Sequence, residues 1–262
     1  MLRARGSSRR GADERVVDDV VSRLYAPGFW IWLHRKVPPA LMRERLLATD
    51  MTERAIFATL IELYRERGCA NNSGTDVIEG EKTPQHLYNV PTLDEWFPGC
   101  KIVHTFRDPR GIYASQLKQI QRSRWGPKEA LARFLPERAA DLLLAPYQLV
   151  HTTLAWRDAV KLHFKYRKLM GDRYILVRFE DLVTQPETEL RRLCTFLGVP
   201  FQPTMLEGVD VVGSGYHDER HVGLGIDPSA ADRWRSHVRP VVNTWFSLAF
   251  GRALQALGYP RS

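Results

Sequence analysis

Apolar residues recur at helical spacing in several stretches of the chain. Residues 16–25 carry valines and a leucine on one stripe, and residues 52–67 place apolar side chains on one face before a glycine that can end the helix. Further helices are predicted over residues 91–97, 109–122, 149–170, 186–197 and 240–257. Most of these begin at a proline, which fits the first helical position. The pattern therefore predicts helices along most of the chain.

Short runs of β-branched and aromatic residues lie between these helices. Residues 102–106 and 174–179 have this composition, and residues 76–81 form a third candidate strand. Residues 125–146 are a basic helical excursion punctuated by proline, and residues 209–232 are a glycine-rich loop. Strands that alternate with helices predict an α/β protein, with a parallel sheet that helices flank.

The first residues differ in composition from the rest of the chain. Residues 1–13 are rich in arginine, glycine and serine, which is typical of a disordered segment. The whole length of 262 residues suits one fairly large domain. We therefore predict a flexible basic tail over residues 1–15 and a single domain over residues 16–262.

The junction that follows residues 102–106 has the features of an anion site. The predicted strand stops at Arg107, Asp108 can cap a helix, and Pro109 can start it. A helix N-terminus at the carboxyl end of a parallel strand is a common place for anions to bind. Ser115 lies two helical turns past Asp108, so its hydroxyl projects on the same face. A fixed cation, free backbone N–H groups and a hydroxyl therefore converge on a volume that suits a phosphate.

The charge of the chain agrees with an anionic partner. The formal net charge is +8 and the isoelectric point is about 9.6. Such a balance favours nucleotides, phosphorylated or sulfated molecules, nucleic acid or anionic lipid, although most of the arginines suit a solvated surface. Charge alone therefore leaves the class of partner open.

Cysteines and apolar runs exclude other classes. Three widely spaced cysteines without a CxxC pair argue against a disulfide framework and against zinc. No apolar run approaches the roughly 18 residues of a membrane span, so we predict none. The basic N-terminus has no apolar stretch behind it, so it does not resemble a secretory signal, and we expect a cytoplasmic protein.

Five short motifs resemble the sulfotransferase family, whose members use 3′-phosphoadenylyl sulfate (PAPS) as sulfuryl donor. They are Gly-Glu-Lys-Thr-Pro at 80–84, Phe-Arg-Asp-Pro-Arg-Gly-Ile-Tyr-Ala-Ser at 106–115, Arg-Phe-Glu-Asp-Leu at 178–182, Cys-Thr-Phe-Leu-Gly-Val-Pro at 194–200 and Asp-Arg-Trp-Arg at 232–235. Their order and spacing match from about residue 50 to the C-terminus. The resemblance implies a three-layer, P-loop-like α/β fold, PAPS as co-substrate and no metal.

The resemblance also implies roles for individual residues. Arg107 and Ser115 match the positions that hold the 3′-phosphate of the donor, and a guanidinium makes strong charge-assisted bonds to phosphate. The alternative for Arg107 is an ion pair with Asp108 or a neighbouring carboxylate. The alternative for Ser115 is helix packing with a bond to its own backbone.

Two further positions match the part of the motif at 80–84 that supplies chemistry in related carbohydrate sulfotransferases. Glu81 matches the catalytic base, since the acceptor hydroxyl must lose its proton as the new bond forms. Lys82 is a candidate for offsetting charge on the leaving phosphate. The alternative is a Glu81–Lys82 pair that only caps the end of a strand.

The chain departs from the family pattern at two places. Phe179 stands where many members carry a tyrosine near the adenine, and we expect Glu180 and Asp181 to cap the turn that follows it. No Gly-x-x-Arg-Ser-Gly-Thr-Thr loop for the 5′-phosphosulfate is found, and residues 6–11 have only part of its composition. We therefore expect the first strand of the fold to be missing, and a chain of this extent to be weakly active or inactive.

Three functions are compatible with these observations. The first is a PAPS-dependent sulfotransferase that acts on a hydroxyl or amine of a small molecule, carbohydrate or peptide. The second is a non-catalytic nucleotide-binding relative that keeps the 3′-phosphate half of the site. The third is a basic nucleic-acid-binding protein, but no helix-turn-helix, zinc or RNA-binding signature accompanies the charge, so we expect no nucleic acid. The oligomeric state is left open.

Overall fold

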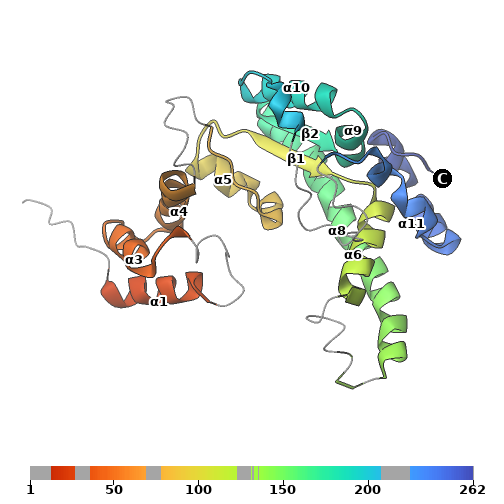
Figure 1. Ribbon diagram of the computed structural model, residues 1–262, viewed down its shortest axis with the longest axis horizontal. Coiled ribbons are helices and arrows are strands. Elements are labelled where there is room, and N and C mark those ends of the chain that lie inside the picture. Colours follow the sequence, from red (N-terminus) through yellow and green to blue (C-terminus); the bar gives the residue numbers. More distant parts are fainter. Residues whose placement is uncertain are drawn as a thin grey trace, which may run out of the picture. The chain divides into compact units, whose positions relative to one another are not determined.

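The computed structural model describes residues 13–26, 36–68, 78–122, 131, 133–134, 136–207 and 225–261 (Figure 1). The chain divides into two compact units, Met1–Pro84 and Gln85–Ser262, and each is described by itself. The expectation of a single domain over residues 16–262 stays a prediction.

The first unit is a cluster of helices around a small apolar core. Its helices are α1 (Glu14–Leu24), α3 (Pro39–Leu47) and α4 (Glu53–Gly68). The core consists of Val17, Val37, Met42, Leu46 and Leu63. The Arg43 guanidinium on α3 donates to the carboxylates of Glu14 and Asp18 on α1, each at 2.7 Å. Apolar contact and ion pairs therefore hold α1 and α3 together.

Two of these helices were predicted, one was missed, and a predicted strand is wrong. The helices expected at 16–25 and 52–67 are confirmed as α1 and α4. Helix α3 was not predicted; it is short and begins at Pro39, directly behind Pro38, and proline fits the first turn of a helix. Residues 78–81, from the strand predicted at 76–81, have no regular secondary structure, and residues 76 and 77 lie outside the described part.

The second unit is built on two parallel strands. Strand β1 (Ile102–Phe106) pairs with β2 (Tyr174–Arg178) in a register that runs from Ile102 opposite Tyr174 to Phe106 opposite Arg178. The chain between them passes through α6 (Pro109–Arg122) and the long α8 (Glu137–Met170). This is the βαβ-type connection of an α/β fold, so the predicted parallel sheet with flanking helices is confirmed.

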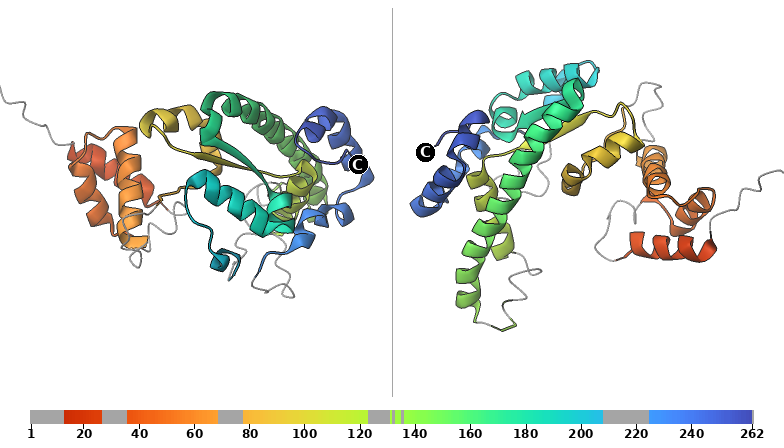
Figure 2. Two further views of the ribbon diagram at one scale, coloured as in Figure 1. Left: turned by 90° about the horizontal axis from the view of Figure 1, so that it is seen from above. Right: turned by 180° about the vertical axis from the view of Figure 1, so that it is seen from behind.

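Helix α8 covers one face of these strands (Figures 1 and 2). Trp156 on α8 packs against Phe106 with the rings 5.4 Å apart, and against Phe250 at 4.6 Å. Farther along the helix, Tyr166 and Met170 join Tyr174 of β2 in a second apolar cluster. The ends of β1 and β2 are thereby fixed to one rigid helix.

Two buried histidines share one tyrosine between α8 and the sheet. Nδ1 of His104 lies 2.6 Å from the Tyr174 hydroxyl, and Nδ1 of His163 lies 2.9 Å from the same oxygen. Burial, followed by the nearby His163, lowers the pKa of His104 to about 4. Burial likewise lowers the pKa of His163, so both rings are neutral core groups at neutral pH.

The remaining helices complete the second unit. They are α5 (Val90–Trp96), α9 (Phe179–Thr184), α10 (Pro186–Leu197) and α11 (Pro240–Ala256), with short 3-10 helices η1 (Pro84–Tyr88), η2 (Gly171–Arg173), η3 (Pro203–Leu206), η5 (Pro228–Ala231) and η6 (Arg233–Ser236). The helices predicted at 91–97, 109–122, 186–197 and 240–257 are confirmed. Gly198, in left-handed conformation with φ of 83°, ends α10 as expected.

Helix α8 differs from the prediction in its start. It begins at Glu137, well before the expected residue 149, and carries Pro146 inside it. Proline removes one backbone hydrogen bond from a helix. The packing of α8 against α6 stabilises the helix, which continues past Pro146. Within the described ranges, no helix combines the length and hydropathy that crossing a bilayer requires.

Candidate functional site

The junction between β1 and α6 forms as the sequence predicts. The Asp108 carboxylate accepts from the backbone N–H of Arg110 at 2.8 Å, and α6 starts at Pro109. The aspartate therefore satisfies one of the N–H groups that a helix start leaves without a partner. Arg107 consequently stands between the end of a parallel strand and the first turn of a helix.

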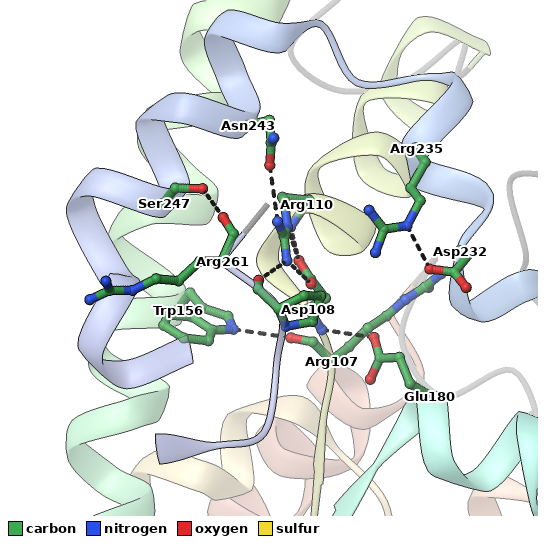
Figure 3. Close-up of polar contacts among 11 residues, drawn as sticks. Arg107, Asp108, Arg110, Trp156, Glu180, Asp232, Arg235, Asn243, Ser247 and Arg261 are labelled. Carbon is green, nitrogen blue, oxygen red and sulfur yellow. Dashed lines mark hydrogen bonds and ion pairs between the residues drawn. The ribbon is translucent and has the colours of Figure 1, made fainter. Parts of the chain in front are cut away.

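The Arg107 side chain lies across the start of α6 (Figure 3). Its guanidinium lies over the Phe179 ring at 4.1 Å, and Nη2 is 3.4 Å from the carbonyl oxygen of Ala230. A Cβ added at Gly111 would come within 3.0 Å of the Arg107 Nε. Glycine at this position therefore lets the guanidinium rest against the helix.

Ser115 shares the helix face on which Arg107 rests. It lies one turn beyond Gly111, and side chains four residues apart lie on the same face of a helix. Its side chain is half-buried, and within the described part of the chain its hydroxyl forms no hydrogen bond. The alternative bond to its own backbone is therefore not present, and the hydroxyl remains able to serve a ligand.

One peptide group at the site is held at both ends (Figure 3). The Trp156 indole N–H donates to the Arg107 carbonyl at 3.0 Å, and the Asp108 N–H donates to Glu180 Oε1 at 2.9 Å. The expectation that Glu180 and Asp181 cap their own turn is wrong for Glu180, because its carboxylate reaches across to the neighbouring strand end. Asp181 forms an ion pair with Arg178 at 3.5 Å.

Arg110, which sequence reasoning missed, is the other arginine of the junction. It is fully buried and makes a two-pronged ion pair with Asp108. It also donates to Asn243 Oδ1 at 2.9 Å and to the Pro260 carbonyl at 2.6 Å, and it lies 4.1 Å from the Trp234 ring. The Asp108 carboxylate therefore pairs with Arg110, and the alternative in which Asp108 forms an ion pair with Arg107 is not observed.

Three buried side-chain atoms at and near Glu180 form no hydrogen bond within the part of the chain that the structure describes. They are Glu180 Oε2, Arg178 Nε and the Tyr259 hydroxyl. Burial raises the pKa of Glu180, while the hydrogen bond from the Asp108 N–H opposes that rise. Burial and the Glu180 charge likewise raise the pKa of Tyr259.

Glu81 and Lys82 belong to the first compact unit, whereas Arg107 and Ser115 belong to the second. Both side chains are exposed in a segment without regular secondary structure. The Thr83 hydroxyl donates to Glu81 Oε1 at 2.6 Å, so the carboxylate is oriented by its own segment. The alternative in which the pair caps a strand end has no described strand to cap. Their chemical roles stay predictions.

An apolar pocket of about 350 Å³ lies elsewhere, where α6, α8 and α11 meet. Its walls include Tyr113, Leu149, Val242, Trp245 and Leu248. None of the four predicted site residues lines it. The pocket is therefore distinct from the Arg107 site.

Comparison with curated proteins gives relatives that share one chemistry. Mouse carbohydrate sulfotransferase 7 (Mus musculus) is 27% identical over 208 residues, which cover 66% of this chain and 42% of the relative. An omega-hydroxy-beta-dihydromenaquinone-9 sulfotransferase, Stf3, of Mycobacterium tuberculosis is 28% identical over 121 residues, 45% of this chain and 28% of the relative. The chain thus spans less than half the length of these curated relatives.

Solved structures agree at the level of the fold. The sulfotransferase domain from the Synechococcus PCC 7002 olefin synthase has a TM-score of 0.58 at 20% identity, covering 93% of this chain and 81% of that domain. The sulfotransferase domain from the curacin biosynthetic pathway has a TM-score of 0.50 at 18% identity, covering 94% and 78%. Residues 8–203 match the profile described as the sulfotransferase family. The chain therefore belongs to the sulfotransferase family.

Proposed function

We propose that the chain transfers a sulfuryl group from PAPS to an acceptor hydroxyl or amine. Membership of the family supports sulfuryl transfer in general, and one observation supports the donor. Arg107 lies at a strand end and over the first turn of α6, on the face that carries Gly111 and Ser115. This arrangement suits the terminal phosphate of a nucleotide.

The 3′-phosphate of the donor is assigned to this face of α6. A phosphate there meets the guanidinium of Arg107, the partial positive charge of the helix N-terminus and the Ser115 hydroxyl. Phe179 lies beneath the guanidinium at 4.1 Å, so its ring stabilises the cation at this position. Charge and geometry therefore favour an anion with several oxygens.

Glu81 and Lys82 are assigned to the chemical step. The acceptor oxygen bonds to sulfur while its proton passes to the Glu81 carboxylate. The bond from sulfur to the bridging phosphate oxygen breaks, and adenosine 3′,5′-bisphosphate leaves with that electron pair. Lys82 stabilises the charge that develops on the leaving phosphate. The bond between Thr83 and Glu81 keeps the carboxylate oriented for this purpose.

The names of the relatives support an alcohol as acceptor. One group acts on carbohydrates, and Stf3 is named for a hydroxylated menaquinone. The common element is a hydroxyl group, so we assign a carbohydrate or another hydroxyl-bearing small molecule to this chain.

Two measurements test the proposal. Titration with adenosine 3′,5′-bisphosphate should show binding that Arg107→Ala weakens at least about tenfold, as expected for lost hydrogen bonds to a charged group. Arg191→Ala is the matched control, since Arg191 is exposed on α10 and pairs with Glu187. Absence of binding to the unaltered chain would contradict the donor assignment.

The second measurement is sulfate transfer from PAPS to a panel of sugars and alcohols. Glu81→Gln should reduce kcat by about a hundredfold, the usual effect of removing a general base. Glu62→Gln, on the exposed side of α4, is the control. If the unaltered chain binds the bisphosphate but transfers nothing, the chain is a nucleotide-binding relative. If Glu81→Gln retains full kcat, the base lies elsewhere.

A further inference from the structure

The peptide group between Arg107 and Asp108 is fixed by two separate elements. Its carbonyl accepts from the Trp156 indole on α8 at 3.0 Å, and its N–H donates to Glu180 on α9 at 2.9 Å. Hydrogen bonds at both ends prevent this peptide plane from rotating. Because Arg107 and the start of α6 are joined through this peptide, its orientation sets the direction in which the guanidinium leaves the backbone.

The sheet register explains why Glu180 reaches this position. Phe106 and Arg178 are the last paired residues of β1 and β2. Asp108 and Glu180 each lie two residues farther along, at the same level beyond the sheet. There the backbone has left the ladder and its N–H has no strand partner. The Glu180 carboxylate takes the place of that partner.

Phe179, the first residue of α9, contacts the side chain of Arg107. The Phe179 ring lies beneath the Arg107 guanidinium, while the adjacent Glu180 carboxylate holds the backbone that carries it. The first turn of α9 thus contacts the guanidinium of Arg107 through Phe179 and the peptide group that follows Arg107 through Glu180.

We propose that Glu180 is a positioning residue that orients Arg107 for recognition of the 3′-phosphate. The inference rests on the proposed function, because it assumes that Arg107 binds that phosphate. Glu180 is assigned no contact with the donor and acts through its carboxylate, which accepts the hydrogen bond of the Asp108 N–H. Without this acceptor the buried N–H group would lack a partner, and the peptide group would rotate to find another one. Arg107 would then bind phosphate in a less favourable geometry.

The test compares two ligands that differ only in the 3′-phosphate. Dissociation constants are measured for adenosine 3′,5′-bisphosphate and adenosine 5′-phosphate, and their ratio is the 3′-phosphate selectivity. Both ligands titrate the same sample, so a loss of folded protein cancels in this ratio. A residue that only supports the fold would change the melting temperature but leave the selectivity unchanged.

Three variants carry the expected outcome. Glu180→Met keeps the length of the side chain but removes the acceptor, and should lower the selectivity about tenfold. Glu180→Gln keeps an acceptor oxygen and should stay within about threefold of the unaltered chain. Glu187→Gln, exposed on α10, should leave the selectivity unchanged. Trp156→Phe, which removes the donor at the other end of the peptide, should lower the selectivity in the same direction as Glu180→Met.

The failure of this inference is distinguishable from the failure of the proposed function. If the unaltered chain prefers the bisphosphate, Arg107→Ala removes that preference and Glu180→Met retains it, the positioning role is wrong and the donor site stands. If Glu180→Gln loses as much as Glu180→Met, the carboxylate charge matters rather than the hydrogen bond, which also overturns the inference. If the unaltered chain shows no preference, the proposed function itself is wrong.

Discussion

Arg107 and Arg110 lie three residues apart, yet their surroundings differ in kind. Arg110 is fully buried and meets a carboxylate, an amide oxygen, a carbonyl and an indole ring from different parts of the second unit. Arg107 is half-buried, its guanidinium lies over the Phe179 ring and against Gly111, and its Nη2 is 3.4 Å from the Ala230 carbonyl oxygen. Figure 3 shows the two side chains leaving the backbone in different directions. One arginine joins parts of the fold, and the other is the residue for which we propose a role in binding the donor.

The strongest test of this contrast is Arg110→Met. It leaves the Asp108 carboxylate buried without its cation, so we expect a loss of about 3–5 kcal/mol in the free energy of unfolding. Arg107→Met should lose less, about 1–2 kcal/mol, because its side chain is only half-buried and its contacts with the Phe179 ring and the Ala230 carbonyl are each worth about 1 kcal/mol. Urea denaturation of both variants measures the two losses. Similar losses would contradict the contrast.

The histidine pair extends the comparison to a second buried polar cluster. Below its ordinary pKa of 6.5 the unfolded chain protonates His104, whereas the folded chain does so only near about 4. The unfolded state therefore binds more protons in this window, and the free energy of unfolding should fall by about 3 kcal/mol as the pH drops through it. Denaturation curves at pH 7 and pH 4 measure this fall.

His104→Asn should make the pH dependence shallower, because it removes one of the two titrating rings. His151→Gln is the control, since His151 is exposed on α8. An unchanged slope in His104→Asn would show that other groups dominate the acid response.

Arg107→Lys tests whether the geometry of this guanidinium, and not only its charge, matters for the binding that we propose. Lysine keeps the charge but loses the planar fork that pairs with two phosphate oxygens. We expect a loss of about 1–2 kcal/mol in binding of adenosine 3′,5′-bisphosphate, with stability nearly unchanged. Calorimetric titration provides the number, and full affinity in the variant would show that only charge is needed.

Gly111→Ala should change binding and stability in opposite directions, with a lower affinity for the bisphosphate and an equal or higher stability. Alanine stabilises a helix interior by up to about 1 kcal/mol relative to glycine. Its Cβ, however, would lie 3.0 Å from the Arg107 Nε and displace the guanidinium. Affinity for the bisphosphate should fall about threefold to fivefold while the melting temperature holds or rises, within the range of a modest contact. Unchanged affinity would mean that Arg107 moves aside without penalty.

Local signals in the sequence were sufficient for the junction but not for its surroundings. The Asp-Pro pair after a buried strand predicts the helix start at Pro109, because capping depends only on neighbouring residues. For the same reason, the prolines at 186 and 240 mark the first residues of α10 and α11, and Gly198 marks the end of α10.

Contacts between distant segments could not be predicted in this way. The bond from Asp108 to Glu180 depends on the register of two strands, and burial of Arg110 depends on where Asn243 and Pro260 fold back. The strand expected at 76–81 failed because composition says nothing about whether a partner strand is available. Arg107 and Ser115 were chosen as candidates from the sequence and their role in binding stays a prediction, whereas the contacts of Glu180 and Trp156 at this junction were not predicted.

The parallel pairing of β1 and β2 has a consequence for the rate at which the chain folds. His104 and Tyr174 meet although they are 70 residues apart in the chain. Closing so long a loop costs entropy before any contact repays it, and folds rich in such contacts form slowly. The bond between Asp108 and Glu180 forms only after this closure. Nucleotide binding during refolding should therefore appear with the slowest phase, after the helices have already formed.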